Sequence, residues 1–419
     1  MIQSRRVFIV GGNITKFIGA RHPDFIHKKH PDFGKKENPD LEWYIERAVN
    51  GTLESTGVTA EQIEKAWIGN FAGELFSSQG HLGAAVAGSN PGLVNKPIMR
   101  VEGACASGGL ALSSALESIL AGSDVTLAVG AEVQTTVSAR QGGEYLARAS
   151  HFKRQRVIDD FVFPAMFARR IKGCLAAGLV TPRDLALLSV KAYGNANKNP
   201  LAHMHHTKMT LELAEVASDK NPNFLGNEEL KPFLKTSDCS QVSDGGSGVI
   251  LASERGLQKL GKKLSDCIEI VGFGQTAGNL YTDSDPTEMP TTAAAARLAF
   301  QNTNLKASDV NIAEVHDCFN IAEILMLEAC GFAPKGHAVD LVRNGELDIN
   351  GKHPINTGGG LLGFGHPVGA TGIKQVVEIY RQMKGQCGLY QLSRIPSIGL
   401  TANMGGDDKT AVVGLYRNL

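Results

Sequence analysis

GGGLLGFGHPVGATG occupies residues 358–372 and joins a glycine-rich loop to one histidine and then to a predicted helix, residues 369–383. Five glycines precede His366, and glycine allows the backbone to approach a ligand closely. Pro367 and Gly369 then place His366 at the mouth of the helix. A neutral imidazole there is able to accept a thiol proton or to donate to a carbonyl. A phosphate cradle is the alternative interpretation of such a loop.

A second motif, VEGACASGG at residues 101–109, places Cys105 in a tight turn before a predicted small-residue helix, residues 107–121. Backbone N–H groups and the positive end of the helix dipole favour the thiolate, so we expect a lowered pKa for Cys105. The same N–H groups are able to bind an oxyanion. The alternative is a buried packing cysteine at a helix start.

Two further motifs follow predicted strands. EVHDCFN, residues 314–320, puts polar side chains at the carboxyl end of a buried strand, where α/β sheets place their sites. TANMGG, residues 401–406, lies between two strands near the C-terminus, and its glycine N–H groups are suited to complete an oxyanion site.

The order of predicted elements indicates an α/β fold with two similar halves. Strands alternate with helices, which favours mostly parallel, buried sheets. In residues 41–54 we expect Trp43, Ile45, Val49 and Leu53 to point inward. The order repeats, because residues 268–274, 292–303 and 369–383 correspond to residues 7–12, 41–54 and 107–121.

The strand pattern disappears over residues 141–235, which we interpret as an inserted cap. Within it, residues 202–206 (AHMHH) have no Asp, Glu or Cys at ligand spacing, so a solvated loop is favoured over a metal site. His151, Lys153, Arg154 and Arg156 are candidates for phosphate contacts, with a solvated charged stretch as the alternative.

Together, Cys105, the His-Asp-Cys-Phe run at 316–319, the Gly-His-Pro run and the repeat resemble the thiolase superfamily. The run at 316–319 resembles the sterol-carrier-protein type of thiolase and its thiolase-like relatives. The resemblance implies a five-layer αβαβα fold with an inserted loop domain, and a homodimer. We expect an N-terminal core of residues 1–140 plus 236–266, a cap of residues 141–235 and a C-terminal core of residues 267–419.

The resemblance also implies roles for individual residues. Cys105 is the acyl-accepting nucleophile and His366 activates it. His316 and His366 bound one oxyanion site, and the backbone N–H groups of Cys105 and Gly405 bound the other. Acyl-CoA and coenzyme A are the implied binding partners, as substrates, and no further cofactor or metal is expected.

The sequence departs from the family pattern near its C-terminus. Many thiolases carry an acid/base cysteine where this chain has Asn403, and Asp407-Asp408 replace small residues. We therefore predict Cys318 as the second acid/base, because side chains two apart on a strand face one way and a thiol pKa near 8.5 suits exchange near neutral pH.

The predicted function is a thiolase-type acyltransferase, an acetyl-CoA C-acyltransferase or 3-ketoacyl-CoA thiolase of lipid metabolism, acting by Claisen condensation through a Cys thioester. The alternatives are a ketoacyl-synthase-like condensing enzyme, with Cys105, His316 and His366, and a weakly active acyl-CoA-binding protein. Cys318 favours the thiolase.

Composition and short sequence signals narrow the possible functional classes of the protein and its expected compartment. Lys+Arg and Asp+Glu are both 42, which gives no basic bias toward nucleic acid. Seven cysteines without a CxxC pair favour reduced thiols in an intracellular compartment. No apolar run approaches the roughly 18 residues of a membrane span. The C-terminal YRNL is not a peroxisomal signal, and Arg5-Arg6 leave a mitochondrial leader open, so we expect a mitochondrial or cytoplasmic location.

Overall fold

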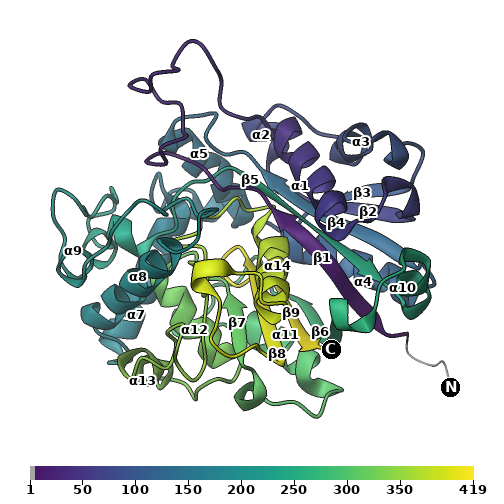
Figure 1. Cartoon of the computed structure of the whole chain (residues 1–419). Coiled ribbons are helices and arrows are strands. Elements are labelled where there is room, and N and C mark those ends of the chain that lie inside the picture. The colour runs from purple at the N-terminus through teal and green to yellow at the C-terminus, as the bar shows by residue number, and fades with distance from the viewer. Residues whose placement is uncertain (1–4) are drawn as a thin grey trace.

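The computed structural model describes residues 5–419 of the chain, which form a mixed α/β fold around one nine-stranded sheet (Figure 1). The strands are β1 (Val7–Ile14), β2 (Lys65–Gly69), β3 (Ile98–Val101), β4 (Val125–Glu132), β5 (Gly245–Ala252), β6 (Ile268–Ala277), β7 (Ile312–Val315), β8 (Ile398–Gly405) and β9 (Thr410–Asn418). Their order across the sheet is β3-β2-β4-β5-β1-β6-β9-β8-β7.

Helices occupy most of the remaining chain. They are α1 (Leu41–Thr56), α2 (Gly73–Phe76), α3 (Leu82–Gly88), α4 (Ser107–Leu120), α5 (Ala139–Leu146), α6 (Phe152–Gln155), α7 (Val162–Ala176), α8 (Pro182–Ala196), α9 (Leu211–Glu215), α10 (Glu254–Leu260), α11 (Pro290–Gln301), α12 (Asn320–Ala329), α13 (Ala338–Arg343) and α14 (Thr371–Met383). None of the helices in residues 5–419 combines the length and the apolar character that a membrane crossing needs.

The predicted internal repeat is present in the strand pairing. In the first half β2 is parallel to β4, and β4, β5 and β1 follow in antiparallel order. In the second half β7 is parallel to β8, and β8, β9 and β6 follow in the same way. Even the register shift recurs, between Ile9 and Gly11 in β1 and between Ile270 and Gly272 in β6.

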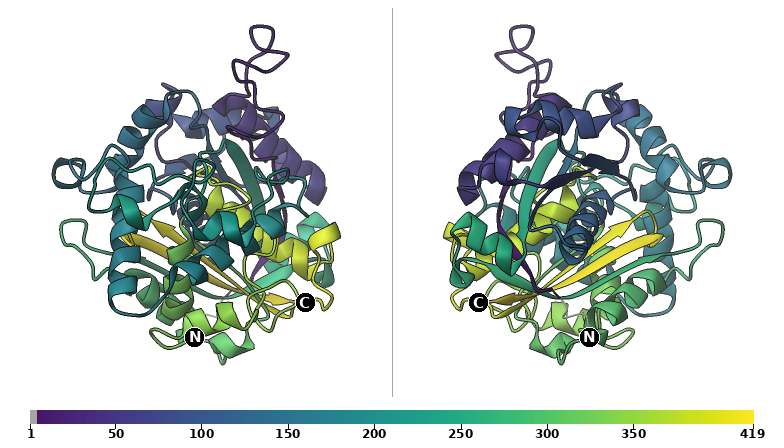
Figure 2. Two further views of the ribbon diagram at one scale, coloured as in Figure 1. Left: turned by 90° about the vertical axis from the view of Figure 1, so that its left-hand side faces the viewer. Right: turned by 90° about the vertical axis from the view of Figure 1, so that its right-hand side faces the viewer.

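The helices divide into an inner pair and two outer groups. The inner pair lies between the two halves of the continuous sheet, so each half forms one β layer of the expected five-layer arrangement. Helices α4 and α14 pack against each other and against strands of both halves. Their close approach depends on glycine, because a Cβ on Gly108 would lie 2.8 Å from the Gly369 carbonyl oxygen. Helices α1, α3 and α10 cover the first half, and α11 and α12 cover the second (Figures 1 and 2).

The two ends of the sheet differ. Strand β3 pairs with β2 along one edge only, and within the described residues its other edge has no strand partner. Strand β7 ends the sheet at the other side, but Ala313 there pairs with the segment before the glycine-rich loop. The Ala313 N–H donates to Pro354 O at 3.0 Å, and the Asn356 N–H donates to Ala313 O at 2.9 Å.

Between β4 and β5 the described chain contains helices α5–α9 and no strand. Helices α7 and α8 share one apolar cluster with α12, so this segment is attached to the core of the second half. Phe167 of α7, for example, stacks on Phe319 with ring centroids 4.2 Å apart.

Elsewhere, the loop between β1 and α1 projects from the body (Figure 2).

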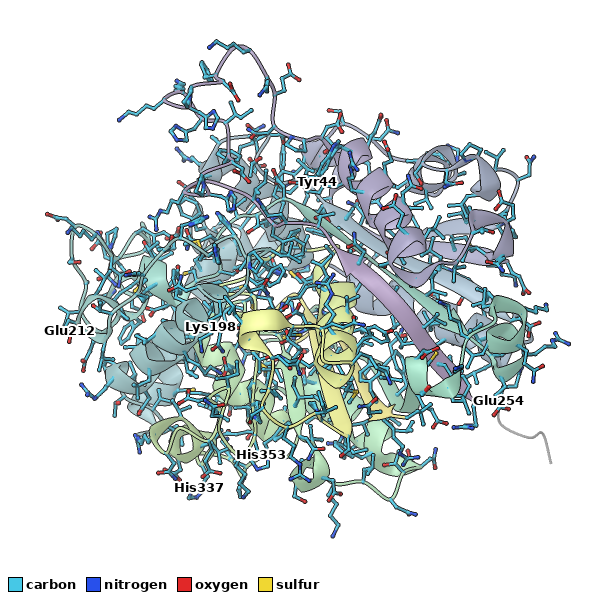
Figure 3. The ribbon with its side chains drawn as sticks, viewed as in Figure 1. Tyr44, Lys198, Glu212, Glu254, His337 and His353 are labelled. Carbon is cyan, nitrogen blue, oxygen red and sulfur yellow. The ribbon has the colours of Figure 1, made fainter. Side chains whose placement is uncertain are left out.

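Two sequence-based expectations are wrong in detail. Trp43 is 39% exposed, whereas its neighbour Tyr44, which is labelled in Figure 3, is buried. The helical periodicity brings Leu41, Tyr44 and Ile45 onto the inner face of α1. His203, predicted in a solvated loop, is buried. Its Nδ1 lies 2.9 Å from Ser243 Oγ, and its Nε2 lies 2.9 Å from Ala20 O.

Candidate active site

Cys105 lies in the turn that joins β3 to α4, two residues before the helix begins. The preceding residue, Ala104, has φ 52, a left-handed conformation that is strained for a residue with a Cβ. Side chains hold the turn, because Glu102 Oε1 accepts the Ala104 N–H at 2.6 Å and Ser107 Oγ accepts the Gly103 N–H at 3.0 Å. The turn directs the thiol of Cys105 into a cavity.

The C-terminal glycine run approaches this turn from β8. Gly405 leaves no space for a side chain, because a Cβ there would lie 2.1 Å from Gly103 O. The next residue, Gly406, provides the backbone N–H that hydrogen-bonds the Cys105 sulfur, and it lines the cavity. Gly406 belongs to the TANMGG motif, whose glycine N–H groups the sequence suggests for an oxyanion site, and the oxyanion role of Gly405 stays a prediction.

The expected lowering of the Cys105 pKa is wrong. Burial of the thiol raises its pKa to about 12, and the nearby carboxylates of Glu132 and Glu102 act in the same direction. Hydrogen bonds from the backbone N–H groups of Gly406 and of Cys105 itself oppose this shift without overcoming it. In the resting site Cys105 is therefore a neutral thiol.

His366 follows the glycine-rich loop and faces the same cavity. Its Nδ1 lies 2.7 Å from Thr371 Oγ1 in the first turn of α14, and its backbone carbonyl accepts from Gln134 Nε2 at 3.2 Å. Its Nε2 is buried and has no protein partner among the described residues. Burial lowers the pKa of His366 to about 3, so the imidazole is neutral.

The structure brings His316 beside His366. Their rings are nearly perpendicular, at 87°, with centroids 5.0 Å apart. The Cys105 sulfur and one nitrogen of each ring lie within 4.8 Å of one another. Burial, followed by the neighbouring His366, lowers the pKa of His316 well below its ordinary value.

These three side chains also form the only cluster in residues 5–419 with three or more Cys, His or carboxylate ligand atoms close enough to hold a metal ion. Cysteine sulfur and histidine nitrogen are both zinc ligands. The same atoms are suited to a different task, because a thiol beside two neutral imidazoles provides a nucleophile, a proton acceptor and a hydrogen-bond donor.

Asn403, on β8, holds the cluster together. Its Nδ2 lies 3.1 Å from Cys105 O and 3.1 Å from His316 Nδ1, and its Oδ1 accepts the Gly109 N–H at 3.1 Å. A single amide therefore contacts the nucleophile turn, one histidine and helix α4.

Cys318 lines the cavity together with His316. The expectation of an unperturbed thiol pKa is wrong, because burial, with Cys105 and Asp317 nearby, raises the Cys318 pKa well above its ordinary value. Cys318 therefore holds its proton firmly. Cys239, which the sequence suggested only as a packing thiol, is also buried and lines the same cavity.

The cavity has a volume of about 330 Å³ and a mainly apolar wall. Helices α5 and α7 and the segment before β5 form much of this wall, so the predicted cap segment contributes to the site. Six phenylalanines line it: Phe71, Phe161, Phe163, Phe167, Phe224 and Phe319.

The acidic pair after Gly406 has structural partners. Asp407 accepts from Arg170 Nε at 2.5 Å, and Asp408 accepts the N–H groups of Thr291 and Thr292 at the start of α11.

Among the candidate phosphate-binding residues, Arg154 pairs with Asp283 at 2.9 Å.

Comparisons with known proteins agree with this fold. Residues 33–255 match the family model "Thiolase, N-terminal domain", and residues 272–418 match "Thiolase C-terminal domain-like". The chain is 33% identical to an acetyl-CoA acetyltransferase of Methanothermobacter thermautotrophicus over 89% of this chain and 93% of that protein. It is 30% identical to the benzoylsuccinyl-CoA thiolase subunit BbsB of Thauera aromatica over 74% of this chain and 77% of that protein.

A solved structure shares the fold. The monomeric SCP2-thiolase-like protein type 1 of Mycobacterium smegmatis superposes with a TM-score of 0.70 at 15% sequence identity. The alignment covers 100% of this chain and 78% of that protein.

Proposed function

We propose, since this chain belongs to the thiolase family, that it forms or breaks the carbon–carbon bond of a 3-ketoacyl-CoA through a thioester on Cys105. Relatives that are acetyl-CoA acetyltransferases support the acyltransferase class. The observation that carries the proposal is the approach of Cys105, His316 and His366 within 4.8 Å in one cavity.

In the cleavage direction, the sulfur of Cys105 attacks the C3 carbonyl carbon while its proton passes to Nε2 of His366. The unpartnered Nε2 supports this acceptor role. Because the Cys105 pKa is about 12 and the His366 pKa about 3, transfer ahead of attack is unfavourable, and the proton moves as the sulfur–carbon bond forms. The backbone N–H of Gly406 is available to the C3 oxyanion.

The C2–C3 bond then breaks and leaves an acyl group on Cys105 and the enolate of acetyl-CoA. We assign Cys318 as the acid that protonates this enolate carbon, and its raised pKa supports a role as a proton holder. Coenzyme A then attacks the thioester and its thiol proton passes to the Cys318 thiolate. Acyl-CoA leaves as the bond from the acyl carbon to Cys105 breaks, and His366 returns its proton to the Cys105 sulfur. Synthesis follows the same steps in reverse.

We assign the cap role to residues 141–235, whose side chains contribute to the wall of the cavity. The six phenylalanines suit the acyl chain and the apolar parts of the pantetheine arm. No further cofactor enters this scheme, because coenzyme A thioesters are the substrates.

The test is intact-mass spectrometry of the full chain after incubation with acetoacetyl-CoA. We expect a stable mass increase of one acetyl group, which Cys105→Ala abolishes. Cys239→Ala is the matched control, because it removes another thiol of the same cavity and should leave the adduct unchanged. An adduct that survives in Cys105→Ala, or no adduct in the wild type, would contradict the proposal.

A second candidate is a condensing enzyme of the ketoacyl-synthase kind, which one observation favours. The site has a Cys-His-His set, and Asn403 stands where many thiolases carry a cysteine. Such an enzyme would generate its carbanion by decarboxylating a malonyl thioester. Release of CO₂ from malonyl-CoA by the acylated enzyme, without proton exchange at acetyl-CoA, would favour this candidate.

We infer a homodimer that pairs through the open edge of β3. Met99 in this strand is 50% exposed, which supports burial by a second copy. Sedimentation analysis tests the assembly, with Met99→Lys expected to favour the monomer.

All seven cysteines are free, which supports a reducing compartment such as the cytoplasm or the mitochondrial matrix.

A further inference from the structure

The hydrogen bonds of Asn403 determine which way its amide points. Oδ1 accepts the Gly109 N–H, and Nδ2 donates to Cys105 O. Exchanging the amide oxygen and nitrogen would set the NH₂ group against the Gly109 N–H and the oxygen against the Cys105 carbonyl. Both contacts would then be repulsive, so a single orientation satisfies the backbone on both sides.

The packing around the amide leaves it no room to turn. A Cβ on Gly109 would lie 2.8 Å from Asn403 Oδ1, and a Cβ on Gly372 would lie 2.3 Å from the same atom. Glycines of α4 and α14 thus form a tight slot for this amide, and Asn403 is itself buried. The second hydrogen of Nδ2 consequently has one acceptor within reach, which is Nδ1 of His316 at 3.1 Å.

An imidazole that accepts at Nδ1 carries its proton on Nε2 when it is neutral. Because Nδ1 of His316 accepts the Asn403 amide hydrogen, it carries no proton, and the ring is therefore neutral. His316 also lines the cavity, and none of the described residues hydrogen-bonds its Nε2. That N–H is therefore available to an oxygen atom of a bound substrate.

His366 has the opposite arrangement. The Thr371 hydroxyl lies 2.7 Å from His366 Nδ1 and donates to Pro367 O at 3.0 Å. A carbonyl only accepts, and the hydroxyl has one proton, so both contacts are satisfied when Nδ1 of His366 carries the proton. Its Nε2 then presents a lone pair, as a proton acceptor needs.

We propose that Asn403 is a positioning residue that holds His316 in the Nε2–H tautomer, so that His316 presents a proton and not a lone pair to the substrate oxyanion. The identity of that oxyanion rests on the proposed function, whereas the tautomer itself does not. Without the Asn403 contact, a lone pair on Nε2 would repel the developing negative charge. Two adjacent imidazoles thus have different tasks because Asn403 and Thr371 contact them differently.

The direct test is nitrogen NMR of the resting full-length enzyme labelled with ¹⁵N-histidine. Variants that lack His316 or His366 assign the signals by their loss. We expect His316 to show a protonated Nε2 and an unprotonated Nδ1, with the reverse for His366. A wild-type spectrum in which His316 is protonated at Nδ1 overturns the proposal, whatever the enzyme catalyses.

The second test is the pH profile of Asn403→Asp, which places an acceptor where the donor was. Below the pKa of the pair formed by the new carboxyl group and His316, the pair holds two protons. One of them lies on Nε2 of His316, whether the other lies on Nδ1 or on the carboxyl group. Above that pKa, the remaining proton lies on Nδ1 facing the carboxylate. Acetoacetyl-CoA cleavage should therefore fall by about 10²–10³-fold as pH rises, the effect of losing one oxyanion donor.

The profile of the variant is compared with that of the wild type, because burial raises the pKa of Glu132, near Cys105, and of Glu314, two residues before His316, to about 7. The other groups near His316 do not titrate between pH 5 and 9. Cys105, His366 and Cys318 line the same cavity as His316, and the pKa values of Cys105 and His366, about 12 and about 3, lie outside the range of pH 5 to 9. Cys318 has its pKa raised well above the ordinary value, and Asp317 is turned away to accept the Leu361 N–H at 2.6 Å.

Matched variants separate positioning from a structural effect. Thr401→Val, on the same strand, removes the buried contact of Thr401 with the Tyr416 hydroxyl and leaves His316 untouched, so its pH profile should equal that of the wild type. Asn403→Ala should lower the rate of acetoacetyl-CoA cleavage without adding a new dependence of that rate on pH.

A flat pH profile in folded Asn403→Asp overturns the proposal. If that variant does not fold, the wild-type NMR spectrum still decides. An inactive wild type with the expected tautomers would refute the proposed function and leave this inference standing.

Discussion

Lys374→Met should weaken the fold and the site together, because Lys374 joins the two elements that carry the histidines. Lys374 lies on α14, which begins five residues after His366, and its Nζ is 2.7 Å from Glu314 Oε2. Glu314 lies on β7, two residues before His316. Both side chains are fully buried, so water does not compensate either charge.

The expected loss of stability follows from this burial. Removing one partner of a buried ion pair leaves an uncompensated charge and costs about 3–5 kcal/mol. The double variant Lys374→Met, Glu314→Gln removes both charges, and we expect its free energy of unfolding within about 1 kcal/mol of the wild type. Urea unfolding measures both effects, and the rate of Cys105 acylation reports whether the histidines have moved.

The single variant should also depend on pH in a defined direction. Burial raises the pKa of Glu314 to about 7, above its usual value of 4.5, and the loss of Lys374 raises it further. A carboxyl with a raised folded-state pKa contributes stability below its unfolded pKa and loses it as pH rises through the folded pKa. Lys374→Met should therefore be more stable at pH 5 than at pH 8. A variant as stable as the wild type at pH 8 would refute this account of the pair.

Four other outcomes are expected. His366→Asn should slow acylation of Cys105 by about 10²–10⁴-fold in stopped-flow or quenched-flow assays, and an unchanged rate would remove its role as base. Residues 141–235 should gain protection from hydrogen exchange when coenzyme A is added, and equal protection at saturation would count against a cap. Cys318→Ala should still be acylated but lose deuterium exchange at the acetyl methyl; retained exchange would move the acid/base role elsewhere. Zn²⁺ should inhibit by binding Cys105, His316 and His366, and a prior acyl group on Cys105 should protect, whereas equal inhibition of the acylated enzyme would disprove that site.

The sequence predicted most of the fold because its signals are periodic and repeated. The paired strand–glycine patterns at residues 7–12 and 268–274 correspond to β1 and β6, down to the same register shift. Trp43 was misplaced because neighbouring positions on a helix differ by about 100°, so one residue decides which ring is inside.

The sequence identified three side chains that the structure brings together, but it did not predict their electrostatics. Motifs identified Cys105, His316 and His366, which the structure brings together. Cys105 does not have the low pKa that its place near a helix start suggested, because desolvation depends on the whole cavity, which a local motif does not contain. The role of Thr371 and the contact of the Gly406 N–H with the Cys105 sulfur were not predicted, although both residues lie in quoted motifs. Only the folded chain shows which backbone or hydroxyl group faces a given atom.

The unequal ends of the sheet limit how copies of this chain are able to associate. Growth of an open filament by strand pairing needs two exposed edges per molecule, one to receive a neighbour and one to offer to the next. In the described chain the β7 edge already bonds to Pro354–Asn356, so each copy offers only β3. Pairing of β3 with β3 would occupy the last free edge of both copies. Association by this route therefore terminates at two molecules, and the fold avoids polymerisation without charged residues along a second edge.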